Sequence, residues 1–148
     1  MRKGFTLIEV SLAVLVFIVV LTSLLSLYIS FIKLSEDTLA TTRAFFSAQK
    51  MMETIRGYNF NKIKNDFDGY TFTPEGFSSD KAKGIVYVTE EEGRSDLLRV
   101  NIVICFKSGE RIIGEDLNLN GNLDIGEDKN NNDMLDSPVE ITTLITSR

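Results

Sequence analysis

Oxygen-bearing side chains recur at alternate positions in residues 116–127, which read DLNLNGNLDIGE. This segment matches the calcium-loop template D-x-[DN]-x-[DN]-G-x5-E at every specified position. In such a loop alternate side chains point inward, a glycine permits a sharp turn, and the final glutamate binds with both oxygens. Oxygen ligands without imidazole or thiolate favour calcium over zinc or copper. The predicted calcium ligands are Asp116, Asn118, Asn120, Asp124 and Glu127, with the main-chain carbonyl of Asn122.

The residues that follow repeat part of this spacing. Positions 1, 3, 5 and 9 of a second loop are filled by Asp128, Asn130, Asn132 and Asp136. Val139 stands at position 12, however, Glu140 comes one residue later, and Asp133 replaces the glycine. The sequence therefore predicts a weaker second calcium site, with a solvated acidic loop as the alternative for either segment.

The predicted loop lacks the two flanking helices of an EF-hand, since GERII precedes it and DKNNNDMLDSPVE follows it. It resembles the calcium loops of dockerin and thrombospondin type-3 repeats, which use the same pattern of acids and amides. Three of its side-chain ligands are carboxylates, so we expect a dissociation constant of roughly 10⁻⁴ to 10⁻³ M. The ion would be structural, because it would order a loop whose charges repel one another when empty.

The negative charge of the chain is concentrated in this region. The formal net charge is −5, but residues 115–140 hold eight acids against the single base Lys129, a balance of −7. The remainder carries +2, without the clustered Lys and Arg that phosphate contacts require, so no direct nucleic-acid binding is predicted. The chain has no His, no Trp and one Cys, and no nucleophile, base and orienting group occur together. An enzyme is therefore not expected.

Residues 10–32 form an uncharged apolar run, VSLAVLVFIVVLTSLLSLYISFI, which as a helix spans about 35 Å and can cross a bilayer. Its apolar residues surround the helix instead of forming one stripe, as lipid exposure requires. Arg2 and Lys3 precede it, which predicts a cytoplasmic N-terminus and an exported body. Glu9 lies at the edge of the run. An ionised acid at the middle of a membrane costs about 3 kcal/mol. We expect Glu9 to reach headgroup water in a lone chain or to pair with a neighbour's amine in an assembly.

The sequence MRKGFTLIEVSLAVLVFIVVL resembles the N-terminus of type IV prepilins and type II secretion pseudopilins. The likeness rests on the basic leader, Gly4, Phe5, the FTLIE stretch and the apolar run. It implies that a prepilin peptidase removes residues 1–4 by cutting between Gly4 and Phe5, that Phe5 is N-methylated, and that the apolar helix is retained. It also implies that Glu9 neutralises the α-amino group of an adjacent subunit and sets the register of assembly. The implied partners are other pilins or pseudopilins through this helix, the prepilin peptidase and the inner-membrane assembly platform.

The apolar run departs from many major pilins, which carry a helix-kinking proline in its middle where this chain has Ser23 and Ser26. This favours a minor pilin or pseudopilin. The implied location is the bacterial inner membrane, with a single pass and a cytoplasmic N-terminus, followed by a periplasmic or extracellular filament. The alternative is a permanently membrane-anchored, exported, calcium-binding adhesion module.

The elements that must position these residues are a helix and a sheet. The transmembrane and assembly helix at 5–32 is predicted to continue as an amphipathic helix over 33–57, ending at Gly57. The apolar stripe suited to packing on a sheet consists of Phe45, Ala48, Met52 and Ile55. The run AFFSAQKMMETIRGYNF also resembles the helix-ending segment of minor pilins and pseudopilins.

Residues 58–84 are predicted to be a connecting loop with little regular structure, and 85–148 an antiparallel sheet domain with the calcium-loop insertion at 115–138. Strand patterns occur in GIVYVTEE, LLRVNIVICFK, SGERII and PVEITTLITSR. In the second, Val100, Ile102, Ile104 and Phe106 share one face, and Cys105 lies half-buried on the other. The expected fold class is α+β, pilin-like: a long N-terminal α-helix, transmembrane in its first half, packed on a small antiparallel β-sheet.

Overall fold

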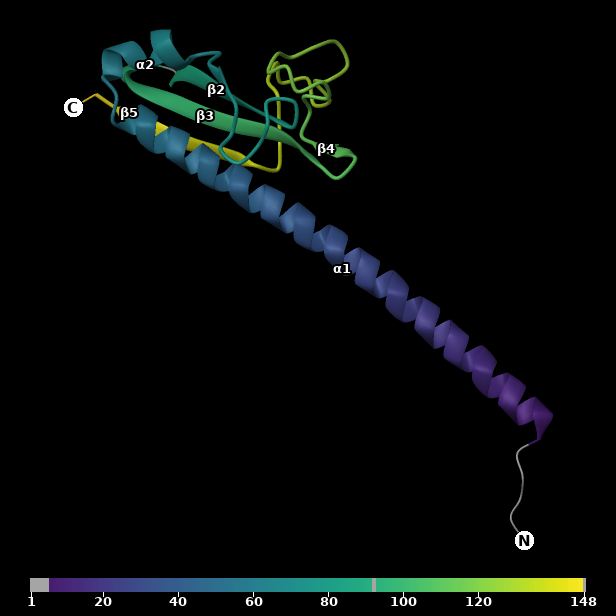
Figure 1. Ribbon diagram of the computed structural model, residues 1–148. Helices are drawn as coiled ribbons and strands as arrows, with labels where there is room; N and C mark the ends of the chain where they lie inside the picture. Colours follow the sequence, from purple (N-terminus) through teal and green to yellow (C-terminus); the bar gives the residue numbers. More distant parts are fainter. Residues whose placement is uncertain (1–5, 92, 148) are drawn as a thin grey trace. The chain divides into compact units, whose positions relative to one another are not determined.

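The computed structural model describes residues 6–91 and 93–147, so the leader with Gly4 and Phe5 lies outside the described residues. The chain divides into two compact units, of which the first ends at Glu36 and the second begins at Asp37. The elements, shown in Figure 1, are α1 (Leu7–Arg56), α2 (Phe60–Phe67), β1 (Thr71–Phe72), β2 (Ala82–Glu91), β3 (Arg94–Ser108), β4 (Arg111–Ile113) and β5 (Glu140–Thr146). A long helix and a small antiparallel sheet confirm the α+β class.

The first unit is the apolar part of α1. Its length and composition are compatible with a single membrane span. Four hydroxyl groups within it donate to main-chain carbonyls of the preceding turn, namely those of Ser11, Thr22, Ser23 and Ser30. These bonds occupy the hydroxyl hydrogens, and so lower the cost of placing the side chains in lipid.

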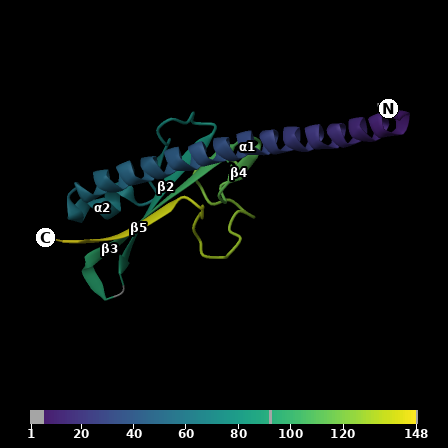
Figure 2. The same ribbon diagram turned by 90° about the horizontal axis from the view of Figure 1, so that it is seen from below.

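The last turns of α1 belong to the second unit and pack on the sheet (Figure 2). Their buried residues are Ala44, Ser47, Ala48, Met52 and Ile55. The predicted stripe is therefore correct except at Phe45, which is 43% exposed. Ala44 takes that place because a step of four residues from Ala48 stays on the buried face, and a small side chain there lets the helix approach the strands.

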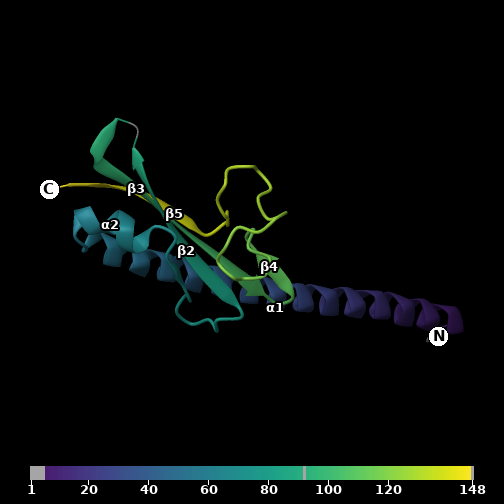
Figure 3. The same ribbon diagram turned by 90° about the horizontal axis from the view of Figure 1, so that it is seen from above.

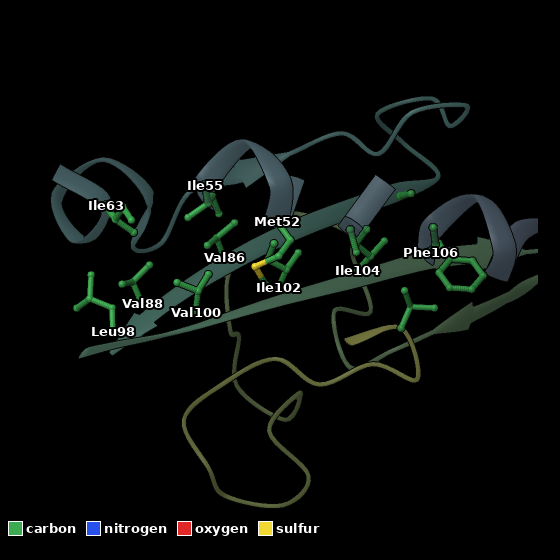
Figure 4. Close-up of a cluster of buried hydrophobic side chains, with 14 residues drawn as sticks. Met52, Ile55, Ile63, Val86, Val88, Leu98, Val100, Ile102, Ile104 and Phe106 are labelled. Carbon is green, nitrogen blue, oxygen red and sulfur yellow. The ribbon is translucent and has the colours of Figure 1, made fainter. Parts of the chain in front are cut away.

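β3 is the central strand and pairs antiparallel with three others. β2 lies along one side, with Val88 opposite Val100, and β1 extends the sheet beyond β2. β4 and β5 share the other side of β3, where Ile102 stands opposite Ile141. The side chains of Leu98, Val100, Ile102, Ile104 and Phe106 pack in the core with α1, as Figure 4 shows, so the predicted strand face is confirmed.

The expected loop at 58–84 is partly regular, because it contains α2 and β1. The side chain of Asn59 accepts a hydrogen bond from the main-chain N–H of Asn61 and caps α2, and Ile63 is fully buried in the core. Phe60, Ile63 and Phe67 stand at steps of three and four and pack on the same core, so the helical period was present in the sequence although a loop was expected. The predicted connection EEGRSD is also shorter, since β3 already begins at Arg94.

Candidate functional site

The acidic region lies between β4 and β5 and forms two consecutive loops, on the sheet face opposite α1 (Figure 3). Alternation along β2 and β3 places a second set of side chains on that face. The loops cover these side chains and form a second hydrophobic cluster with them, made of Ile85, Val103, Cys105, Leu119 and Leu135, with Tyr87, Ile112 and Leu123 at its edge. A packed apolar base therefore positions the polar loops.

In the first loop the residues at the two ends are drawn inward. Asp116 is 1% exposed, and its two carboxylate oxygens accept from the main-chain N–H groups of Asn120 (3.1 Å) and Gly121 (2.7 Å). Glu127 is 4% exposed and accepts from the main-chain N–H groups of Leu117 (2.7 Å) and Asp124 (3.0 Å). Positions 1 and 12 of the predicted site are thus both fixed by the loop's own backbone.

Gly121, at position 6, has a φ of +80°, which side-chain-bearing residues rarely adopt. A Cβ at this position would lie 2.8 Å from Thr71 Cγ2. The glycine is therefore needed both for the turn and for the close approach of the loop to β1.

The middle of the first loop gathers the remaining predicted ligands. The side-chain amides of Asn118 and Asn120 each donate to the same oxygen of Asp124, at 2.7 Å. The main-chain N–H of Asn122 donates to the side-chain oxygen of Asn120 (2.6 Å), and the Asn122 side chain is exposed. Hydrogen bonds within one loop therefore connect the five predicted residues, with Asp116 and Glu127 bonded to main-chain N–H groups and Asp124 to the two amides.

Burial raises the pKa of Asp116, although N–H donors from Gly121 and Asn120 act in the opposite direction. Throughout residues 6–91 and 93–147, no ion pair involves an acid of either loop. A cation would compensate a desolvated carboxylate that has only neutral donors beside it.

No three His, Cys, Asp or Glu side chains in the described part of the chain are grouped so that they could hold an ion by themselves. The first loop's donors are of mixed type, because two amides and a carbonyl stand among its three carboxylates. All are hard oxygen donors, and their number suits calcium better than magnesium. Calcium would require Asn118 and Asn120 to present oxygen in place of the N–H groups that now donate to Asp124.

The second loop has the same internal contacts. Asp128 accepts from the main-chain N–H groups of Asn132 and Asp133, both at 3.1 Å. The amides of Asn130 and Asn132 donate to one oxygen of Asp136. Asp133 has a φ of +59°, so it adopts the left-handed conformation of the missing glycine. The four predicted second-site residues are therefore also brought together.

Neither residue at the end of the second loop sequence is placed to close it. Val139 is 2% exposed and packs in the core with α1. Glu140 is exposed and is the first residue of β5, opposite Val103.

Cys105 is more buried than expected, at 2% exposure, because the loops cover the face that the strand pattern leaves half-exposed. Its thiol lies 3.8 Å from the main-chain oxygen of Asp136. Burial raises the pKa of the thiol to about 11.

Glu9 has a partner within its own chain. One oxygen of its carboxylate accepts from both the main-chain N–H and the hydroxyl of Thr6, each at 2.8 Å, and the Glu9 N–H donates to the Thr6 hydroxyl at 3.4 Å. This is a capping box, in which a Thr and the Glu three residues later satisfy each other's main-chain donors. The T-x-x-E spacing was visible in the sequence as a signal for it.

Comparison of the chain with family models, with curated proteins and with solved structures returned no match. The functional conclusion therefore rests on the chain's own residues and their geometry.

Proposed function

We propose that this chain is a non-enzymatic minor pilin or pseudopilin, a structural subunit of a type IV pilus or type II secretion-like filament, with a calcium-stabilised loop. The observation that carries the proposal is the division of α1. From Val10 to Ile32 the helix is uncharged and exposed, and five later residues between Ala44 and Ile55 are buried on the sheet. Such a helix can join a folded domain to a lipid or protein environment.

Transfer of the apolar part from lipid to a bundle of like helices keeps its side chains in an apolar medium. The acid near its start sets the specificity of the transfer. In a single chain Thr6 satisfies the Glu9 carboxylate. In a filament the α-amino group of an adjacent subunit would supply a full opposite charge. A buried carboxylate is tolerated when it faces a buried amine but not when it is unpaired. Such a pair fixes the axial offset between neighbouring subunits more than it adds stability.

The calcium loops would act on the domain and not on the membrane helix. Their apolar residues Leu119 and Leu135 pack against the sheet, so ordering the loops completes the second hydrophobic cluster. Binding of calcium to the folded form alone would add RT ln(1 + [L]/Kd) to its stability. The partners proposed are other pilins or pseudopilins, the prepilin peptidase and the assembly platform, in a bacterial inner membrane.

The test is the mass of the N-terminal peptide of the full chain, expressed in cells with and without an active prepilin peptidase. We expect loss of residues 1–4 and a methyl group on Phe5 only when the peptidase is present. Gly4→Val, which adds a branched side chain at the cut, is the control that should remain intact. An uncleaved wild-type N-terminus in peptidase-containing cells would reject the proposal in favour of the permanently anchored adhesion module.

A further inference from the structure

Asn120 is the only asparagine of the chain that is followed by glycine. In such a pair the main-chain nitrogen of the glycine can attack the side-chain carbonyl carbon of the asparagine, because glycine has no Cβ to obstruct the approach. Leucine follows both Asn118 and Asn122, and its side chain hinders the same attack. The first loop therefore holds one reactive pair between two asparagines that serve as matched unreactive sites.

The reaction needs only water. The bond from the Gly121 nitrogen to Cγ of Asn120 forms as the Cγ–Nδ2 bond breaks. The proton of the Gly121 N–H goes to solvent, the leaving nitrogen takes a proton from solvent, and ammonia departs. Water then opens the cyclic imide at either carbonyl carbon: its hydroxyl bonds to that carbon and its hydrogen returns to the Gly121 nitrogen. The product is an aspartate or an isoaspartate at position 120, with no oxidation or reduction.

The folded loop withholds the attacking nitrogen. The N–H of Gly121 is buried and donates at 2.7 Å to Oδ2 of Asp116, which is 1% exposed. The nitrogen must lose its proton as it attacks, and the adjacent carboxylate opposes the negative charge that develops there. The main chain at Gly121 also lies against β1, since a Cβ there would be 2.8 Å from Thr71 Cγ2. The nitrogen therefore becomes available only when this part of the loop opens.

The side-chain amide of Asn120 is held as well. Its oxygen accepts from the N–H of Asn122 at 2.6 Å, and its nitrogen donates to Oδ2 of Asp124 at 2.7 Å. These bonds fix the side-chain torsions, whereas the attack needs the nitrogen and Cγ in a near-attack arrangement. Departure of the amide nitrogen also breaks its bond to Asp124. Both reacting groups are thus restrained in the closed loop.

The product does not fit the closed loop. A carboxylate at position 120 has no N–H to donate to Asp124 and places a second negative charge beside it. An isoaspartate also lengthens the main chain next to Gly121, where the loop passes close to Thr71. Residues 115–140 already carry a balance of −7. The modified loop is therefore expected to stay open.

We infer that Asn120–Gly121 is a gated modification site: the closed first loop preserves the pair, and opening of the loop lets Asn120 convert permanently to aspartate or isoaspartate. The inference does not depend on calcium binding, because it uses only the covalent chemistry of the pair and its contacts with the protein. Each conversion records an opening of the loop and removes a contact that closed it.

The test follows the detergent-solubilised full chain in chelator, folded and unfolded in urea. Trypsin cuts after Arg111 and Lys129, so the peptide 112–129 carries all three asparagines of the loop. Mass spectrometry of this peptide locates the change from amide to acid. We expect conversion at Asn120 alone, slower by about tenfold or more in the folded protein, because the reaction requires local opening. Equal rates in the two states would overturn the gate. Conversion first at another asparagine, or none in urea, would overturn the site.

Asp116→Ala isolates the contact that withholds the nitrogen. It should speed conversion in the folded protein by about tenfold or more and leave the rate in urea unchanged. Asp128→Ala, the equivalent change in the second loop, is the matched control and should convert as the wild type does. A folded Asp116→Ala that converts no faster than the wild type would overturn the role of Asp116. The comparison of folded and unfolded wild type decides the gate if this variant does not fold.

Asn120→Asp tests the consequence of the modification. Hydrogen exchange at the Gly121 N–H should be faster than in the wild type by about tenfold or more, because the like charges at 120 and 124 favour the open loop. Asn122→Asp adds the same charge at an exposed side chain and should exchange as the wild type does. Equal protection of Gly121 in Asn120→Asp and the wild type would overturn the expectation that the modified loop stays open.

Discussion

The hydroxyl oxygen of Tyr87 accepts a hydrogen bond from the main-chain N–H of Leu135 at 2.9 Å. Tyr87 lies on β2 and Leu135 at position 8 of the second loop, so this bond joins the loop to the sheet. Leu135 is 1% exposed and packs beside Val103 and Cys105. The hydrogen bond from Leu135 to Tyr87 therefore lies beside the apolar contact that Leu135 makes with the sheet, and both attach the loop to it.

Tyr87→Phe should weaken this attachment, because it leaves the buried N–H of Leu135 without its acceptor. We expect a loss of about 1–3 kcal/mol in the free energy of unfolding, measured by urea titration of the detergent-solubilised chain in chelator. Tyr70→Phe, at a tyrosine that is 45% exposed, is the control and should change little. Equal stability of the two variants would show that the bond does not hold the loop.

Gly121→Ala should destabilise the domain through backbone strain and through a steric clash. Gly126→Ala, which introduces only the strain, separates the two effects. A side chain at a φ of +80° is strained, and its Cβ would also meet Thr71 Cγ2 at 2.8 Å. At Gly126 the φ is +92° but nothing lies within 4 Å of the added carbon. Both alanine variants should lose about 1–2 kcal/mol from strain, and Gly121→Ala a further 1–3 kcal/mol, roughly, from overpacking. Identical unfolding curves for the two variants would contradict the close approach of the first loop to β1.

Cys105 should make stability depend on pH in the alkaline range. Burial raises the pKa of its thiol from 9.0 to about 11, so the folded protein holds this proton more tightly than the unfolded chain does. The contribution of Cys105 is therefore fully present below pH 9.0 and is lost as the pH rises toward about 11. Urea unfolding of the wild type and Cys105→Ala between these values isolates it, because other titrating groups are common to both. A difference in stability that stays constant with pH would contradict the burial of the thiol.

The periodicities of the sequence predicted the helix and the two faces of β3, because burial on one side imposes a repeat that is visible locally. They placed Phe45 in the core because it lies three residues before Ala48, whereas the helix packs through Ala44, four residues before Ala48. α2 was missed although Phe60, Ile63 and Phe67 recur at steps of three and four, a signal that the sequence contained.

The first loop stays a predicted calcium site; the hydrogen bonds that join its predicted side-chain ligands all lie within twelve residues, which is why the sequence could indicate them together. For the second loop the sequence indicated the four spaced residues but not the contact that Glu115 makes with Lys129 and Asp136. The calcium-loop template covers only residues that follow Asp128 in the sequence. Glu115 precedes Asp128, and its carboxylate accepts from the N–H of Asp136, 21 residues later. Only the fold of the two loops against each other brings this pair together. The Thr6–Glu9 cap, in contrast, was within reach of sequence reasoning, because it depends only on residues three apart.

The central claim is that Glu9 acts through its charge on another subunit and not only as a cap of its own helix. Glu9→Gln tests this directly, because glutamine can still serve in a capping box but cannot neutralise an amine. The measurement is the amount of this chain in sheared filaments from cells that carry a prepilin peptidase and an assembly platform. Glu36→Gln serves as the matched control. The account predicts that Glu9→Gln is cleaved and stored in the membrane but missing from filaments, while Glu36→Gln is incorporated as the wild type is. Normal incorporation of Glu9→Gln, or absence of the wild type from the filaments, would contradict it.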